Sequence, residues 1–369
     1  MHAGRKSLAI LTLALALLLF QSSCFAAPAE QHSQTTAGDS SRAFGEALLL
    51  KLSGSNVEYD KSLGAHAVFK GSKETAFDLH NRKLTYADWT ILGGQKTIKK
   101  LNLAGTNLTD QELEKLKGLV NVEQLDLART KVSAKGLAVL QSFPKLQVLS
   151  VRGIYISDQS AQLLSKLKTL IALDVTDTAI SNAGIASLEK LTQLERLTAN
   201  QLALSESGCK SIAKLKRLQL LAIDKTGLTD NLLNAMAPLT SLRELRVRDN
   251  DLTDAGLETI SGFTLLEELD LGNSKSIDDA GVKKLTGLKN LRLLGLAGTN
   301  ITNQTLDTIT VFKQLENLGL RNTRNIDDSN LQALTKLKNL KELTTVGSKI
   351  TAKGRNYLTA HFPQLHILY

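Results

Sequence analysis

Aromatic residues and prolines are scarce in this chain. Phe, Trp and Tyr together make up 4% of its 369 residues, and only four prolines occur. The interior must therefore be aliphatic, and its regular elements can run with few interruptions, because proline is the residue that breaks helices and central strands. Hydrophobic residues at 42% and charged residues at 22% are otherwise typical of a folded body that faces water.

Recognisable catalytic and metal-binding motifs are also lacking. The six histidines form no H-E-x-x-H pair, and the sequence has no closely spaced cysteine pair, no G-x-S-x-G and no phosphate-binding glycine loop. His361 and His366 flank a Phe-Pro turn, which we interpret as packing in a terminal cap; a metal site is the alternative. We therefore expect neither an enzyme nor a cofactor.

A repeated spacing of leucine-like residues dominates the sequence. Each copy follows L-x-x-L-x-L-x-x-T/N-x-I/L-T/S-D-x-G-L-x-x-L-x-x-L, and successive copies begin 24 or 25 residues apart. The first position of each clear copy is Ile98, Val122, Leu146, Leu170, Leu194, Leu218, Leu242, Leu266, Leu291, Leu315 or Leu340. A degenerate copy opens near Glu74, and a closing half-copy begins at Leu365.

The two halves of the repeat have different periods. In L-x-L the apolar residues alternate, which is the pattern of a short strand with one buried face. The part after T/S-D has helical spacing and begins with a capping residue, and Thr109 with Glu112 matches a capping box. A single copy cannot bury its leucines alone, so the copies must stack. Because helices are wider than strands, the stack bends with its strands inside.

These features resemble leucine-rich repeat proteins over residues 74–369. The resemblance implies an α/β solenoid, a horseshoe with a parallel β-sheet on the concave face and helices on the convex face. The T-x-I-T-D-x-G-L variant is similar to bacterial exported proteins with 24-residue repeats, of the ribonuclease-inhibitor-like or cysteine-containing-like subclass. Extracellular animal and plant members of this family usually carry cysteine-rich caps; the absence of such caps here favours a bacterial periplasm or envelope. No F-box pattern precedes the repeats, so we do not expect a ubiquitin-ligase adaptor.

One polar column departs from the family pattern. It comprises Thr106, Thr130, Thr178, Thr226, Asn250, Thr299 and Thr323, where many relatives carry Asn. We expect each hydroxyl to bond to the neighbouring turn, which makes these residues structural. Two copies have Ile154 and Leu202 instead, which predicts a local irregularity between residues 150 and 205.

Three other columns are also interpreted as structural. Cys209 stands where other copies have leucine or isoleucine, which predicts a core residue; a reactive thiol is the alternative. Glycines that keep the register of the helix start are Gly136, Gly184, Gly208, Gly256 and Gly281. Acids that suit the dipole of the first helical turn are Asp110, Asp158, Asp230, Asp254 and Asp279. Calcium binding is the alternative for these acids.

The segments before the repeats predict export. Residues 1–27 resemble a secretory signal peptide, because Arg5 and Lys6 precede a short apolar run that ends in small residues. The apolar run is too short to span a bilayer. Cys24 offers an alternative, acylation of the lipoprotein type, which would anchor the protein to a membrane. We expect residues 28–41 to be a flexible linker, 42–73 an N-terminal cap, 74–364 about twelve repeats and 365–369 a C-terminal cap.

We look for function on the concave sheet, where outward side chains have no expected structural duty. These positions hold a mixed-charge patch, followed by a nearly bare floor of Gly272, Leu293, Gly295, Ala297 and Gly319. A bare floor lets a partner approach the backbone, and arginines supply directed charged hydrogen bonds. The predicted partner-binding residues are Arg152, Asp174, Arg196, Asp224, Glu244, Arg246, Arg248, Asp270 and Arg321. The alternative is a solvated face whose charges offset one another.

Lysine and arginine exceed aspartate and glutamate by 45 to 36. Most lysines fall on the convex helices and the turns after them, in pieces at Lys115 and Lys117, Lys166 and Lys168, Lys214 and Lys216, and Lys336 and Lys338. A solubilising surface is one interpretation, and attraction to anionic lipid head groups or envelope polymers is the other. Nucleic acid is not expected, because export separates the chain from it and no aromatics interleave with the charges.

We therefore predict a non-catalytic recognition or scaffold module, exported to the periplasm or cell envelope, that binds a protein or peptide on its concave sheet as a monomer. The alternative is a lipid-anchored or secreted surface protein that contacts host or envelope polymers; a membrane is involved only if Cys24 is acylated. On the first hypothesis, exchanging Arg246 and Arg248 for Glu abolishes capture of the partner without changing the melting temperature.

Overall fold

The computed structural model describes residues 75–369. The predicted signal peptide (1–27), linker (28–41) and N-terminal cap (42–73) lie outside the described residues. Within residues 75–369, no helix combines the length and the apolar character needed to cross a bilayer.

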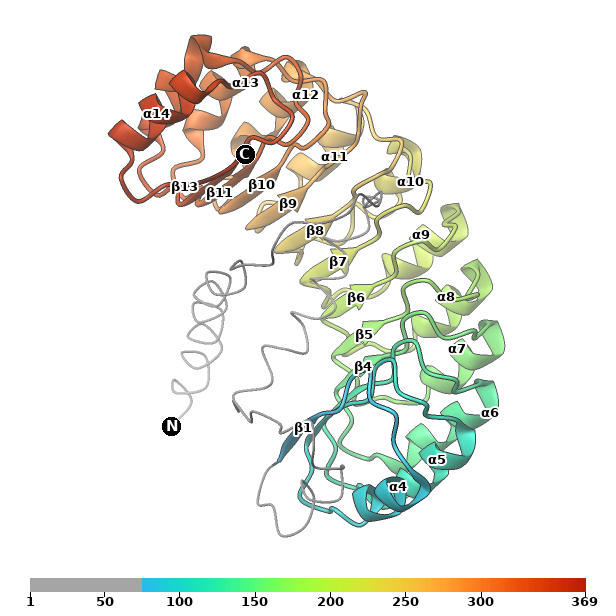
Figure 1. Ribbon diagram of the computed structural model, residues 1–369. Coiled ribbons are helices and arrows are strands. Elements are labelled where there is room, and N and C mark those ends of the chain that lie inside the picture. Colours follow the sequence, from blue (N-terminus) through green and yellow to red (C-terminus); the bar gives the residue numbers. More distant parts are fainter. Residues whose placement is uncertain (1–74) are drawn as a thin grey trace, which may run out of the picture. The chain divides into compact units, whose positions relative to one another are not determined.

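Thirteen parallel strands form one sheet in the described part of the chain, and each pairs with its sequence neighbours (Figure 1). The strands are β1 (Ala76–Asp78), β2 (Lys100–Asn102), β3 (Gln124–Asp126), β4 (Val148–Ser150), β5 (Ala172–Asp174), β6 (Arg196–Thr198), β7 (Leu220–Ala222), β8 (Glu244–Arg246), β9 (Glu268–Asp270), β10 (Leu293–Gly295), β11 (Asn317–Gly319), β12 (Glu342–Thr344) and β13 (His366–Leu368). The predicted α/β solenoid with a concave parallel sheet is confirmed.

Short helices connect the strands and line the outer side of the arc (Figure 1). The α-helices are α4 (Tyr86–Gly93), α5 (Asp110–Lys115), α6 (Ala134–Leu137), α7 (Asp158–Leu164), α8 (Asn182–Leu188), α9 (Glu206–Ile212), α10 (Asp230–Asn234), α11 (Gly256–Ser261), α12 (Asp279–Lys284), α13 (Asn303–Thr308) and α14 (Ala352–His361). The 3-10 turns are η2 (Leu116–Gly118), η3 (Ala138–Ser142), η4 (Leu285–Gly287), η5 (Ile309–Val311) and η6 (Asp328–Lys336). The capping box predicted at Thr109 and Glu112 is present at the start of α5.

The strand register repeats with the sequence. Leu101 of β2 stands opposite Leu125 of β3, which stands opposite Leu149 of β4. Because equivalent residues pair in this way, the leucines of all copies merge into one continuous core. Each fully buried leucine contributes about 1.5–3 kcal/mol relative to an exposed one, so stacking of copies stabilises the fold.

A turn with positive φ follows each strand from β1 to β12. Its third residue is often glycine, asparagine or aspartate, but Arg129, Gln201 and Lys225 adopt φ angles of 55°, 62° and 55°. A left-handed conformation costs a residue with a Cβ about 1–2 kcal/mol. These three positions are therefore strained, and the sheet geometry maintains them.

The polar column after the strands closes turns in two ways. The hydroxyl of Thr106 donates to the carbonyl of Leu103 in its own copy (2.7 Å). A second kind of bond, to the neighbouring copy, is made by Asn250, whose Oδ1 accepts the backbone N–H groups of Thr226 and Leu228, each at 3.0 Å. The side chain of Asn250 is longer than that of threonine, so its amide group reaches from its own copy to the preceding one. The column is structural as predicted. The Thr226 hydroxyl donates both to the carbonyl of Ile223 in its own turn (2.9 Å) and to Asn250 Oδ1 of the next copy (3.3 Å).

The irregularity predicted near Ile154 and Leu202 is wrong for the sheet. Strands β4 to β7 keep a one-to-one register. Ile154 and Leu202 are 1% and 2% exposed. An apolar residue in this column enters the core and leaves the strand pairing unchanged.

The aspartate and glycine columns join neighbouring copies at the helix starts. Asp158 in α7 accepts hydrogen bonds from the backbone N–H and the hydroxyl of Ser181, the N-cap of α8, each at 2.7 Å. A Cβ on Gly184 would lie only 2.4 Å from Asp158 Oδ1, so a side chain there would displace this carboxylate. The same carboxylate clamp joins Asp110 to Ser133, Asp230 to Thr253, Asp279 to Thr302 and Asp328 to Thr351. These aspartates thus serve the next copy, which the sequence analysis missed.

Cys209 lies in α9 and is fully buried. Burial raises the pKa of its thiol to about 11. A thiol that stays protonated at neutral pH is a poor nucleophile. The interpretation of Cys209 as a core residue is confirmed.

Candidate functional site

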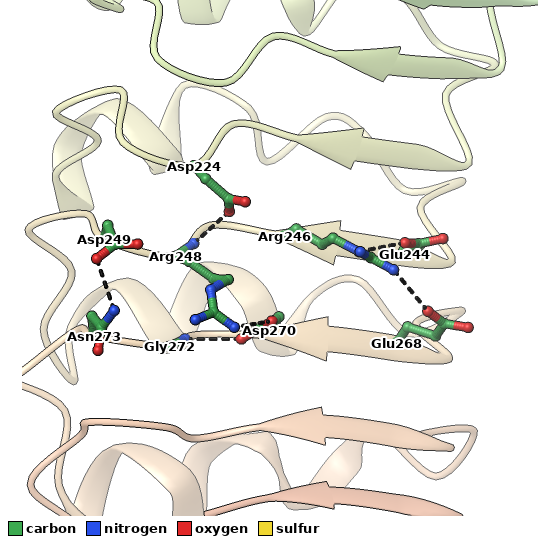
Figure 2. Close-up of polar contacts among 9 residues, drawn as sticks. All are labelled: Asp224, Glu244, Arg246, Arg248, Asp249, Glu268, Asp270, Gly272 and Asn273. Atoms are coloured by element: carbon green, nitrogen blue, oxygen red, sulfur yellow. Dashed lines mark hydrogen bonds and ion pairs between the residues drawn. The ribbon is translucent and has the colours of Figure 1, made fainter. Parts of the chain in front are cut away.

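One contiguous charged cluster lies on the concave side of strands β7 to β9 (Figure 2). Glu244 and Arg246 are the first and last residues of β8, Asp270 ends β9, and Asp224 and Arg248 follow the ends of β7 and β8 by two residues. These five predicted residues therefore occupy three adjacent copies. A sixth member, Glu268, was missed; it stands opposite Glu244 in the strand register, and following that outward column would have found it. The charged cluster comprises Asp224, Glu244, Arg246, Arg248, Glu268 and Asp270.

The remaining predicted residues lie elsewhere along the sheet. Arg152 follows β4 and Asp174 ends β5. Burial raises the pKa of the Asp174 carboxyl, and the charge of nearby Arg152 offsets this only in part. Arg196 begins β6 and Arg321 follows β11, and both side chains are exposed. The predicted set is thus one cluster with separate residues on either side of it.

Arg246 lies between two glutamates. Its Nε is 2.6 Å from Oε1 of Glu244, and its NH2 is 3.6 Å from Oε2 of Glu268 on the next strand (Figure 2). The contact with Glu244 is ionic, because its Oε1 has no hydrogen-bond partner of good geometry within the described residues. Burial lowers the pKa of Arg246, but these carboxylates outweigh that effect and raise the pKa above its ordinary value.

Arg248 connects three copies. Its backbone N–H donates to Asp224 Oδ1 (2.8 Å), and its guanidinium NH1 donates to Asp270 Oδ2 (3.1 Å). The other oxygen of Asp270 accepts the backbone N–H of Gly272 (3.0 Å; Figure 2). Asp174 likewise accepts a backbone N–H of its own turn (2.9 Å). The assumption that outward side chains have no structural duty is therefore wrong for these three aspartates.

Two glycines of the predicted bare floor are covered by the cluster. A Cβ on Gly272 would meet the guanidinium carbon of Arg248 at 3.2 Å, and a Cβ on Gly295 would meet Asp270 Oδ1 at 2.5 Å. At Gly319 the three nearest heavy atoms all belong to the backbone of the preceding copy, and the first is 3.4 Å away. The floor is therefore bare at Gly319, and the prediction is wrong for Gly272 and Gly295.

A family model described as "Leucine Rich repeat" matches residues 239–261 and 264–285, which include strands β8 and β9. The chain is similar to an internalin from Listeria monocytogenes, with a TM-score of 0.57 and 21% identity, over 83% of this chain and 93% of that one. It is also similar to a leucine-rich repeat protein from Leptospira interrogans, with a TM-score of 0.50 and 20% identity, over 80% and 90%. The fold is that of a leucine-rich repeat solenoid. No curated protein matches the chain in sequence.

At this identity the likeness concerns the leucine-rich repeat fold alone. The 24-residue T-x-I-T-D-x-G-L subclass stays a prediction, because the matching structures do not distinguish it. The function must therefore be argued from the concave surface itself.

Some concave carboxyls of the leucine-rich repeat sheet are hard to ionise. Burial raises the pKa of Asp224 to about 6. Burial also raises the pKa of Asp126 to about 7, although its Oδ1 accepts the backbone N–H of Ala128 at 2.8 Å. The concave face therefore gains negative charge between mildly acidic and neutral pH.

Within residues 75–369, no group of three or more His, Cys, Asp or Glu side chains is placed to hold a metal ion. Arginines fixed by carboxylates beside an open stretch of backbone can recognise the charges and the main chain of a partner.

Proposed function

We propose that this leucine-rich repeat protein is a non-catalytic recognition module that binds a protein or peptide on its concave sheet. Solenoids of this kind present an extended concave surface without any need for a catalytic centre. The signal peptide predicted for residues 1–27 supports export to the periplasm or cell envelope.

The observation that carries the proposal is the open floor at Gly319. In the strand register Gly319 stands between Gly295 of β10 and Thr344 of β12. Ala297 and Val346 follow these two residues by two positions; Val346 is 37% exposed, and Leu293 is also partly exposed. An extended peptide placed over this floor contacts backbone and small apolar groups. Arg321, on the same copy as Gly319 and exposed, reaches acidic groups of that peptide.

The charged cluster borders this floor on the β9 side. Arg246 and Arg248 are already held by carboxylates, so they lose little side-chain entropy when a partner binds. Four acids surround these two arginines, so the cluster favours cationic groups of the partner. A peptide that places a basic part near β8 and β9 and an acidic part near Arg321 would complement both the charged cluster and the floor.

The test is to fill the floor and measure peptide binding. In Gly319→Gln the new side chain projects over the floor; its position is equivalent to Arg246 and Asp270, so the strand end accepts a side chain there. The matched control is Gly287→Gln in the convex turn η4, where a Cβ has no neighbour within 4 Å. The purified exported protein is used to select binders from a phage-displayed random peptide library.

Selected peptides are expected to bind the wild type and Gly287→Gln, and to lose at least about tenfold in affinity for Gly319→Gln. Melting temperatures of all three proteins check folding. Peptides that bind Gly319→Gln as well as the wild type, or a library with no enriched binder, would contradict a concave site at this floor.

The export part of the proposal has its own test. Intact-mass spectrometry of the protein from an envelope fraction is expected to show a chain that starts close to residue 28 without a lipid. A mass that includes acyl chains on Cys24, lost in Cys24→Ala, would instead support the lipid-anchored alternative.

A further inference from the structure

A second surface, on the rim between the convex helices and the strands, carries a concentration of positive charge. It consists of seven exposed side chains in four successive copies, which we call the basic patch: Lys145, Lys166, Lys168, Lys190, Lys214, Lys216 and Arg217. The concave floor at Gly319 lies several copies away. The inference therefore does not depend on the function proposed above.

The basic patch is ordered by the repeat. Lys166, Lys190 and Lys214 each stand two residues after the last residue of α7, α8 and α9, so they form one row across adjacent copies. Lys168 and Lys216 form a second row beside it. The equivalent first-row positions in the copies before and after are Ser142 and Pro238. The first row is confined to three copies and the whole basic patch to four, and clustering, more than net charge, indicates a binding surface.

Little of this charge is neutralised within residues 75–369. Glu189 Oε2 is 2.8 Å from Lys214 Nζ, and Glu195 Oε1 is 3.3 Å from Arg217 NH2. Lys168 Nζ donates to the carbonyl of Lys190 (3.1 Å), which leaves its charge unpaired by an acid of this region. Seven cations against these two acids leave five positive charges, so the basic patch suits a ligand with several anionic groups.

The surroundings narrow the class of ligand. The exposed large apolar side chains of the described residues are Tyr86, Val120, Tyr155, Leu265, Val346, Tyr357 and Tyr369. None of them belongs to the basic patch, so it has no large apolar side chain to insert into a membrane and could contact a lipid surface only through its charge. Bases of a single-stranded nucleic acid would also lack aromatic rings to stack on.

Neutral polar side chains and the spacing of the rows point to sugars. Thr192 and Gln193 are exposed between the lysines. The Gln193 Oε1 already accepts a hydrogen bond from Arg217 NH1, so the Thr192 hydroxyl and the Gln193 amide N–H groups offer hydrogen bonds to hydroxyl groups. Packed helices lie about 8–10 Å apart, so the cations of one row are spaced more widely than the successive phosphates of a polyphosphate. We propose that the basic patch binds a linear anionic polysaccharide whose acidic groups are separated by sugar rings.

The test uses heparin oligosaccharides as the probe and the full exported chain as the protein. One variant removes the first row, Lys166→Gln with Lys190→Gln and Lys214→Gln. The matched control, Lys289→Gln with Lys313→Gln and Lys338→Gln, removes the same charge from the equivalent rim of later copies, where these lysines form a single row. Affinity is measured by calorimetry at fixed ionic strength, with melting temperatures as a check of folding.

Loss of the first row is expected to weaken heparin binding on the order of a hundredfold, because each lysine near an anionic surface contributes separately. The control is expected to change it by less than about threefold. A second variant, Lys168→Gln with Lys216→Gln, tests the other row and is expected to weaken binding in the same direction.

Three results would overturn the proposal. Equal weakening in the patch variants and the control would show a response to net charge alone. Equal or tighter patch-dependent binding of single-stranded DNA or of vesicles with anionic lipids would assign the patch to another ligand class. Loss of heparin binding in Gly319→Gln, with binding kept in both patch variants, would move the polyanion site to the concave face.

Discussion

The carboxylate of Asp230 in α10 accepts two hydrogen bonds from Thr253 in the next copy, one from the backbone N–H (3.0 Å) and one from the hydroxyl (2.6 Å). Neither residue can make this contact within its own copy. Similar clamps recur along the described chain, so the solenoid is stabilised by the joints between nearest neighbours.

Asp230→Ala is expected to lower the free energy of unfolding by about 1–3 kcal/mol, because it leaves two donors of Thr253 without their acceptor. Urea denaturation followed by circular dichroism measures the change. The control is Asp251→Ala, an exposed carboxylate in the same copy as Thr253, which should change stability by less than about 0.5 kcal/mol. Equal losses in the two variants would mean that the clamp contributes nothing specific.

Lys225→Gly is expected to raise the stability by about 0.5–1 kcal/mol. Lys225 adopts a φ of 55°, which glycine reaches without strain, and this gain exceeds the greater freedom of glycine in the unfolded chain. Lys131→Gly is the matched control, since Lys131 forms a parallel bridge with Thr109 and has no positive φ. Thermal unfolding should move in opposite directions for the two variants; a loss of stability in both would contradict the assigned strain.

The pH dependence of stability should reveal the ionisation of the Asp126 carboxyl. Its pKa is raised to about 7 by burial, above the unfolded value, so the folded state holds the proton more tightly. The stabilisation is complete at pH values below the unfolded pKa, near 4, and is lost as the pH rises through about 7. Asp126→Asn keeps the acceptor for Ala128 and removes the charge.

Between pH 5 and 8, the wild type is therefore expected to lose about 1–3 kcal/mol more stability than Asp126→Asn. Asp251→Asn serves as the control for removal of a surface charge. Parallel stability curves for the wild type and Asp126→Asn would show that this carboxyl is ionised freely in the folded protein.

Arg248→Met is expected to reduce stability by about 1–3 kcal/mol, because Asp270 then lacks its 3.1 Å ion pair in a partly buried setting. For the same reason, exchanging Arg246 and Arg248 for Glu should lower the melting temperature, contrary to the expectation from the sequence. Arg321→Met is the comparison: it should weaken peptide binding and leave stability within about 0.5 kcal/mol. If Arg321→Met destabilises the protein more than Arg248→Met does, the structural role assigned to Arg248 and the binding role assigned to Arg321 are both contradicted.

The spacing of apolar residues predicted those parts of the fold that are determined within a single copy of the repeat. The alternation of Leu101 and Leu103 places both in the core, and the same rule placed Cys209 there from its column alone. The order of the strands follows as well, because a copy can bury its leucines only against the next copy. The charged residues of the candidate site could be found by the same counting, apart from Glu268.

The sequence by itself determined the repeat, the curvature, the core and which side chains face the concave side, since these follow from local spacing and the burial of leucines. Only the tertiary structure decided what the outward side chains do, because their partners lie one repeat away in the chain. Asp230 binds Thr253, and Asp270 covers Gly295 whereas Gly319 is uncovered. Lys166, Lys190 and Lys214 lie in one row across adjacent copies. The reach of each side chain across neighbouring copies fixes these contacts, and no single copy contains that information.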